Sequence, residues 1–172
     1  MAQKNVEIKA RVKDPEAIRQ YLLSHEAIFA GTDHQTDTYF NTQQGRLKLR
    51  EGNIENNLIG YERNDQAGPK TSVFTLTRIP DAPAFKSIMS KTIGIKVIVN
   101  KIRDIYFIGN VKFHIDRVEG LGSFMEIEAG NLRDASKSEE DLQTQCRFYL
   151  RELGIAEKDL LTNSYSDMLS VH

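Results

Sequence analysis

The chain has 172 residues and a formal net charge of -1, so it lacks the overall positive field that attracts nucleic acid. Its single cysteine, Cys146, excludes an internal disulfide and a cysteine-based zinc site. No apolar run reaches the roughly 20 residues of a membrane span, and the N-terminus shows no signal-peptide pattern. We therefore expect a soluble cytoplasmic protein with one domain over residues 1–172 and no membrane or nucleic-acid partner.

The first half of the chain predicts short strands around a helix. Residues 5–12 alternate strictly between apolar and polar side chains, which indicates a strand. Asp14 and Pro15 then form a helix start, and apolar residues at helical spacing predict a helix over 15–27. Further strands are expected at 35–40, 46–50, 58–63 and 73–79, and a second helix begins after Asp81.

The second half predicts a run of hairpins and a final long helix. Strands are expected at 95–103, 105–108, 111–118 and 123–129, with tight turns at 109–110 and 119–122. Ser138 and Asp141 resemble a capping box before a helix that Gly154 ends, and Cys146 lies on its apolar stripe as a small core residue. A short helix is expected in the tail 157–169. About eight strands and three main helices indicate a mostly antiparallel sheet with helices packed outside it.

Several predicted strands place charged residues in a row on one face. The rows are Glu7, Lys9 and Arg11; Arg46, Lys48 and Arg50; Lys101 and Arg103; Lys112, His114 and Asp116; Glu126 and Glu128. Such a row is commonly a solvated outer face. If the strands close into a barrel with helices over its apolar exterior, the charges must instead face inward. Because isolated buried charges are costly, that lumen would have to contain water and anions.

A polyanion with spaced charges, such as a triphosphate, suits rows of Lys and Arg. Arginine grips phosphate oxygens with two donors, while lysine acts as a point charge. Carboxylates beside phosphates fit a divalent cation, because Mg²⁺ or Mn²⁺ is typically held by one or two carboxylates and by phosphate oxygens. The candidate ligands are Glu7, Glu126, Glu128 and Asp116.

These rows also carry a resemblance to a known family. In segments 5–12, 46–50, 61–63, 101–103 and 114–128 the chain resembles the CYTH family, or triphosphate tunnel metalloenzymes. The last segment is the most specific, and it is most similar to the class IV adenylyl cyclase branch. The resemblance covers nearly the whole chain. It implies an α+β fold, namely a closed, mostly antiparallel eight-stranded β-barrel that forms a triphosphate tunnel with helices packed outside.

The resemblance also implies roles for individual residues. Glu7, Glu126 and Glu128 would be catalytic and, with Asp116, would bind Mg²⁺ or Mn²⁺. Phosphate binding would fall to Lys9, Arg11, Lys48, Arg50, Arg63, Lys101 and Arg103. The family pattern Glu-x-Glu-x-Lys has Asn5 at its first position here, and an amide brings no charge to a metal. His114 stays outside the catalytic set, because a structural role in the sheet fits it equally well.

Three functions remain open at this point. In the first, the chain is an adenylyl cyclase-like enzyme that converts ATP to cyclic AMP and pyrophosphate. Alternatively, the same tunnel would hydrolyse tripolyphosphate or an organic triphosphate. Asn5 keeps open a third alternative, a module that binds a nucleotide or polyphosphate without turnover. The resemblance further admits a homodimer.

Overall fold

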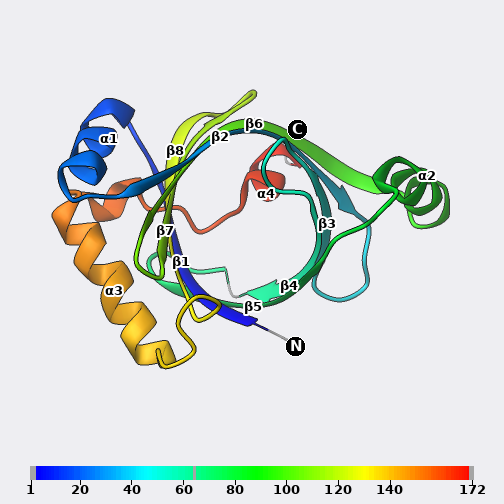
Figure 1. Cartoon of the computed structure of the whole chain (residues 1–172). Coiled ribbons are helices and arrows are strands. Elements are labelled where there is room, and N and C mark those ends of the chain that lie inside the picture. Colours follow the sequence, from blue (N-terminus) through cyan, green and yellow to red (C-terminus); the bar gives the residue numbers. More distant parts are fainter. Residues whose placement is uncertain (1–2, 64, 171–172) are drawn as a thin grey trace.

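Eight antiparallel strands close into a barrel in the computed structural model, which describes residues 3–63 and 65–170 (Figure 1). Around the barrel the strands are β1 (Gln3–Arg11), β5 (Lys70–Thr77), β4 (Asn57–Arg63), β3 (Arg46–Glu51), β2 (Ile28–Phe40), β6 (Ile95–Ile108), β7 (Val111–Val118) and β8 (Gly122–Gly130). The barrel closes because β8 also pairs with β1. The closed antiparallel barrel and the α+β class are thus confirmed.

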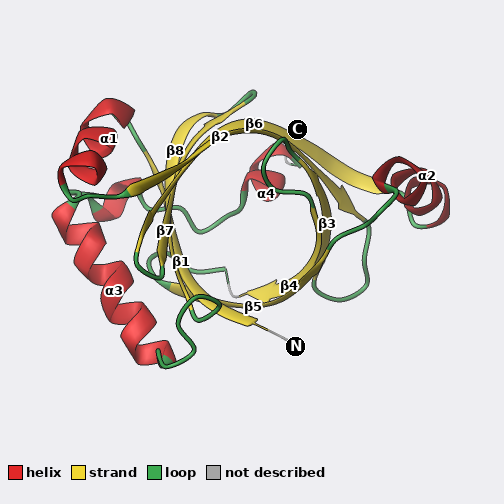
Figure 2. Cartoon of the chain, in the orientation of Figure 1, coloured by secondary structure: helices red, strands yellow, loops and turns green. Residues whose placement is uncertain are grey.

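Helices α1 (Pro15–Ser24), α2 (Ala82–Thr92) and α3 (Glu139–Glu152) lie outside the barrel on two sides (Figure 2). Helices α1 and α3 lie together on one side, over β1 and β8. Helix α2 lies on the other side and contacts β3. The C-terminal segment holds a short 3-10 helix, η1 (Glu157–Asp159), and α4 (Tyr165–Leu169), which is visible within the outline of the ring.

The helix starts follow the predicted capping chemistry. The Asp14 side chain accepts the Ala17 N–H at 3.2 Å, and Ser138 and Asp141 form the expected capping box of α3. Helix α1 ends at Ser24, before the predicted end at residue 27, because Glu26 adopts a left-handed backbone with φ of 58°. A residue in that conformation cannot continue a right-handed helix.

Two strands are longer than the alternation predicted. Strand β2 begins at Ile28, well before residue 35, and its pairing with β6 continues across a register shift next to Gly31. Strand β6 runs unbroken from 95 to 108, although Asp104 interrupts its pattern. Asp104 accepts hydrogen bonds from Arg19 at 2.9 Å and from Thr32 at 2.6 Å, so its charge is compensated and the strand continues. Cross-strand pairing therefore overrides local pattern here.

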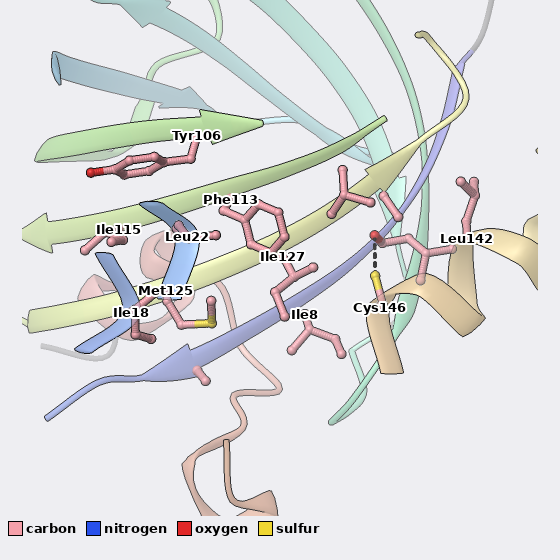
Figure 3. Close-up of a cluster of buried hydrophobic side chains, with 14 residues drawn as sticks. Ile8, Ile18, Leu22, Tyr106, Phe113, Ile115, Met125, Ile127, Leu142 and Cys146 are labelled. Atoms are coloured by element: carbon pink, nitrogen blue, oxygen red, sulfur yellow. Dashed lines mark hydrogen bonds between the residues drawn. The ribbon is translucent and has the colours of Figure 1, made fainter. Parts of the chain in front are cut away.

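The main apolar core lies between the outer face of the barrel and the helices (Figure 3). Ile8 and Ile127 project from β1 and β8 towards Leu22 of α1 and Leu142 of α3, and all four are essentially inaccessible to solvent. Burying each such side chain contributes about 1.5 to 3 kcal/mol relative to leaving it exposed. Because strand side chains alternate between faces, this outward core turns the intervening polar residues into the barrel.

Cys146 belongs to this core, as predicted. Its side chain is fully buried, and its thiol contacts the Val6 carbonyl oxygen at 3.1 Å, drawn as a dashed line in Figure 3. Burial raises the pKa of the Cys146 thiol to about 12, so it stays protonated and unreactive. In the described part of the chain, no helix is both long and apolar enough to cross a membrane.

Candidate active site in the barrel lumen

The lumen of the barrel contains a cavity of about 310 Å³ to which all eight strands contribute side chains. Charged residues dominate its middle. They are Glu7, Lys9, Lys48, Arg50, Glu55, Lys101, Arg103, Lys112, Glu126 and Glu128. The inward rows that the alternation suggested therefore meet around one cavity, except that Arg11, Arg46, His114 and Asp116 do not line it.

Asp37 of β2 organises three of the cations. Arg50 donates to both Asp37 oxygens, from Nε and Nη2, at 2.8 Å each. Lys101 Nζ donates at 2.8 Å, and Lys48 Nζ lies 3.7 Å away. Burial alone raises the pKa of Asp37, but Arg50, Lys101 and Lys48 outweigh burial and hold that pKa well below its usual range. Asp37 thus stays ionised and fixes these cations beside the cavity.

Asp116 of β7 plays the same part for Arg103. The Arg103 guanidinium donates to both Asp116 oxygens at 2.7 Å, and the Tyr165 hydroxyl donates to Oδ2 at 2.8 Å. Burial raises the pKa of Asp116, but Arg103 and Lys101 bring it down to about 2. Asp116 is not among the residues that line the cavity, and both of its oxygens are engaged. In this arrangement it orients Arg103, and the metal role that the resemblance implies for Asp116 stays a prediction.

Acidic residues gather on β1 and β8. Glu7 is directly opposite Glu128 in the β1–β8 pair, and Glu126 lies two residues before Glu128 on the same face. Burial raises the pKa of Glu128; Lys112 opposes this effect, but the like charges of Glu7 and Glu126 raise that pKa further. Glu126 differs, because Lys9 at 3.9 Å and Arg103 at 3.1 Å outweigh its burial and keep its pKa well below the ordinary value.

His114 completes this acidic cluster. Possible ligand atoms of His114, Glu126 and Glu128 all lie within 4.8 Å of one another. Burial lowers the pKa of His114 to about 3, with Arg103 and Lys112 adding to the effect, so the ring is neutral at pH 7. Nδ1 lies 3.3 Å from Glu126 Oε2, and Nε2 has no hydrogen-bond partner among the described residues. A neutral ring whose Nδ1–H faces the carboxylate has its lone pair on Nε2.

These donors fit a divalent cation. Two carboxylates and an imidazole suit Mn²⁺ and other first-row metals, while the carboxylates alone suit Mg²⁺. A cation would also relieve the repulsion that raises the Glu128 pKa. The Asn5 side-chain oxygen is buried at the same cavity without a hydrogen-bond partner in the described part of the chain. It adds an acceptor where the family pattern has a carboxylate.

The two ends of the lumen differ. The C-terminal segment covers one end, since Leu161 N–H donates to the Lys9 carbonyl at 2.9 Å and Lys70 Nζ donates to the Thr162 carbonyl at 2.9 Å. Tyr165 lies there with its ring 3.8 Å from Lys9 Nζ, a favourable cation–π distance. This cover lies towards the C-terminal end of β1, where Arg11 pairs with Phe124.

The opposite end is an apolar mouth. Its lining comprises Ile59, Phe74, Leu76, Phe107 and Leu132. Phe74 pairs with Gln3 at the start of β1, and Leu76 and Leu132 are 39% and 62% exposed, so this end is open. Arg133 lies over the Phe107 ring at 3.6 Å. The lumen therefore runs from a charged interior to a mouth with flat, apolar surfaces.

The structure brings together eight of the residues predicted from sequence. Glu7, Lys9, Lys48, Arg50, Lys101, Arg103, Glu126 and Glu128 all line the cavity. Arg11 does not line it: Arg11 lies at the end of β1 with an exposed side chain, 5.0 Å from the ring of the buried Phe124. The expected phosphate contact of Arg11 is thus not supported by its position. The side chain of Arg63 lies outside the described residues.

Other lumen residues were not selected from the sequence. Asp37 had a usable signal, since the alternation of 35–40 places it on one face with Gln35 and Tyr39. Lys112 shares a strand face with His114, but the sequence pattern assigns it no role. Glu55 and Tyr165 have no such sequence signal, because each reaches the lumen from outside the strands. Loop and tail residues have no periodicity from which their direction can be inferred.

Comparison with known proteins identifies the family. The CYTH domain pattern matches residues 3–165. The chain therefore belongs to the CYTH family. Members of this family bind triphosphate or polyphosphate substrates and depend in general on metal ions.

Among curated CYTH relatives, a Methanocaldococcus jannaschii protein with a provisional adenylate cyclase name is 28% identical over 180 positions, covering 95% of this chain and 97% of the relative. Adenylate cyclase CyaB of Aeromonas hydrophila is 27% identical over 168 positions, covering 93% and 85%. The chain is thus similar along its length to proteins with adenylate cyclase names.

Solved structures support the same fold. A Vibrio parahaemolyticus protein, also provisionally named an adenylate cyclase, has a TM-score of 0.77 at 21% identity and covers 99% of both chains. The Hippeastrum protein HpAC1, described as having a dominant triphosphatase activity, has a TM-score of 0.60 at 15% identity, covering 96% of this chain and 93% of its own. At these identities the likeness establishes the fold alone.

Proposed function

We propose that this CYTH protein is a divalent-metal-dependent enzyme that acts on the phosphate chain of an organic triphosphate bound in the barrel lumen. The observation that carries the proposal is the meeting of fixed cations and a crowded acidic cluster around one cavity. Phosphates need the cations, and carboxylates near phosphates need a metal to offset their repulsion. Family membership supports the same chemistry.

The cations would bind the phosphate chain with little reorganisation. Arg50 and Arg103 are already oriented by the forked bonds to Asp37 and Asp116. Lys9, Lys48 and Lys101 complete the set, all with most of their side chain buried. Donors fixed before the substrate arrives stabilise developing charge without a further cost of orientation.

The acidic cluster would hold the metal. Glu126 and Glu128, with Glu7 opposite, supply carboxylate ligands, and His114 supplies a nitrogen. A bound Mg²⁺ or Mn²⁺ supplies positive charge that offsets the negative charge on the phosphoryl oxygens. Lys9 and Arg103, which both contact Glu126, would position that carboxylate between metal and substrate.

The apolar mouth supports an organic substrate over an inorganic one. Phe74, Leu76 and Phe107 offer surfaces against which a flat ring packs, and inorganic tripolyphosphate has no group that would use them. With ATP the ribose 3′-hydroxyl would attack the α-phosphorus. The new bond forms between O3′ and phosphorus, the bridging bond to the β-phosphate breaks, and the hydroxyl proton is lost to solvent. Cyclic AMP and pyrophosphate result.

Hydrolysis is the second candidate, favoured by the triphosphatase activity ascribed to the Hippeastrum protein. It uses the same cations but replaces the ribose hydroxyl with water. The two reactions differ in their products, since hydrolysis of ATP releases ADP and phosphate or AMP and pyrophosphate.

Product analysis tests both candidates and the binding alternative. The protein is incubated with ATP or tripolyphosphate and with Mg²⁺ or Mn²⁺, and products are separated by ion-exchange chromatography. Cyclic AMP with an equal amount of pyrophosphate supports the cyclase reaction, while ADP or AMP without cyclic AMP supports hydrolysis. Metal-dependent ATP binding without any product would make the protein a binding module. Turnover of tripolyphosphate but not of ATP would overturn the organic substrate.

A further inference from the structure

Glu55 differs from the other carboxylates around the cavity in coming from a loop. Glu7, Glu126 and Glu128 lie on strands, whereas Glu55 lies in loop 52–56 between β3 and β4. Its Oε2 is 2.6 Å from Lys112 Nζ on β7, and its Oε1 is 3.5 Å from Arg50 Nη1 on β3. The loop therefore places one carboxylate in the lumen, in contact with two cations from different strands.

The position of this loop is built into the barrel. Asp33 of β2, which is fully buried, accepts the backbone N–H groups of Ile54 at 3.0 Å and of Glu55 at 2.9 Å. Gln35 donates to Asp33 at 2.8 Å and to Glu55 Oε1 at 3.0 Å. Gly52 allows this approach, because a Cβ there would lie 2.5 Å from Asp33 Oδ1. The loop backbone at Glu55 is thus held in place by buried groups, and the Glu55 side chain extends from it to the cations.

The contacts of Glu55 are those that a phosphate would use. Arg50 and Lys112 both line the cavity, and a carboxylate satisfies the same N–H donors as phosphate oxygens. Lys112 and Arg50 in turn hold the pKa of Glu55 far below its usual value against the opposing effect of burial, so Glu55 is ionised. One donor pair cannot serve both anions fully.

We propose that Glu55 is an internal competitor for the phosphate chain, which must release Arg50 and Lys112 before a polyphosphate can occupy this part of the lumen. The inference rests on the proposed function, because it assumes that polyphosphates bind here. In the ligand-free protein Glu55 compensates the two cations, and on binding it is displaced. Its return would favour release of a product with fewer charges, such as pyrophosphate.

The test compares Glu55→Gln with Glu51→Gln. Both substitutions remove one negative charge near the end of β3, but Glu51 pairs with Lys86 of α2 at 3.0 Å, outside the lumen. Binding of tripolyphosphate and of pyrophosphate is measured by calorimetry at a fixed Mg²⁺ concentration. We expect E55Q to lower both dissociation constants by about tenfold and E51Q to leave them within about twofold of wild type.

The outcomes separate this inference from the proposed function. If wild type binds polyphosphate and E55Q binds it with equal or lower affinity, competition by Glu55 is overturned. The proposed function stays intact in that case. No polyphosphate binding by wild type, E55Q or E51Q would overturn the proposed function and the inference together.

A measurement on the wild-type protein covers the case in which E55Q does not fold. With ¹³C-labelled glutamate, the Glu55 carboxylate resonance should shift when tripolyphosphate saturates the protein, because the carboxylate loses its two cations. A resonance that stays unchanged at saturation would contradict displacement.

Discussion

Two sets of buried carboxylates in the same barrel have opposite surroundings. Asp37 and Asp116 each receive a forked arginine and at least one further donor, and their pKa values lie below the ordinary range. Glu128 lies beside Glu7 and Glu126, and its pKa is raised. The first set is electrostatically complete, whereas the second gains from an added cation.

This difference separates carboxylates that hold the cations of the site in position from carboxylates that are available to bind a metal ion. A carboxylate saturated by protein donors has no free oxygen to offer, so it serves to fix its cations. A crowded carboxylate with a raised pKa, here Glu128, is typical of a functional position, because another charge is expected there. Their burial differs less than their partners do, since Asp37 and Asp116 are fully buried, Glu7 and Glu126 are nearly so, and Glu128 is partly buried.

The largest effect is expected from a substitution in the first set of carboxylates, Asp37 and Asp116. Asp37→Asn leaves Arg50, Lys101 and Lys48 without their shared counter-charge in a buried place, so we expect the free energy of unfolding to fall by about 3 to 5 kcal/mol. Urea denaturation measures this change. Asp65→Asn is the control, because Asp65 is 56% exposed where it pairs with Arg46, and it should cost less than about 1 kcal/mol. Equal losses would refute the structural role of Asp37.

The next effect concerns activity. Glu126→Gln keeps the volume of a residue that contacts Lys9, Arg103 and His114 but removes the charge offered to a metal. Metal-dependent turnover should fall at least about a hundredfold, while Asp116 still holds Arg103 and preserves the fold. Steady-state kinetics with Glu140→Gln, a change on the exposed surface of α3, provides the control. Wild-type turnover in E126Q would remove Glu126 from the proposed site.

A smaller effect appears in the pH dependence of stability. The folded-state pKa of Asp116 is about 2, below the value of about 3.9 expected in the unfolded chain. Its stabilising contribution is therefore complete above about pH 4 and is lost as the pH falls through about 2. Urea unfolding of wild type and Asp116→Asn should show a difference that narrows over this window. A difference that stays constant from pH 5 to pH 2 would contradict the depressed pKa.

The smallest effect has the opposite sign. Because the charged form of Glu128 is disfavoured in the folded protein, Glu128→Gln should raise the unfolding free energy of metal-free protein by about 0.5 to 1 kcal/mol. The same variant should lose most of the stabilisation that Mn²⁺ gives to wild type. Thermal unfolding with EDTA and with Mn²⁺ measures both. A destabilised metal-free E128Q protein would place Glu128 with the saturated carboxylates.

Much of the fold and part of the site could be predicted locally. The alternation in segments such as 46–50 predicted that Lys48 and Arg50 share a face, and the cavity contains both. Arg11 continued its row in sequence but lies where β1 ends, so its side chain reaches the outside. The full lengths of β2 and β6 also escaped prediction, because each is stabilised by pairing with the other.

The sequence by itself determined which side chains share a face, because the two-residue period of a strand depends only on local backbone geometry. Only the tertiary structure decided which charges meet. Strand order brings Asp37 into contact with Lys101, 64 residues away in the sequence. Loop placement brings Glu55 into contact with Lys112, 57 residues away. Electrostatic compensation acts through space rather than along the chain, so the division between completed and unsatisfied carboxylates arises only when the barrel closes.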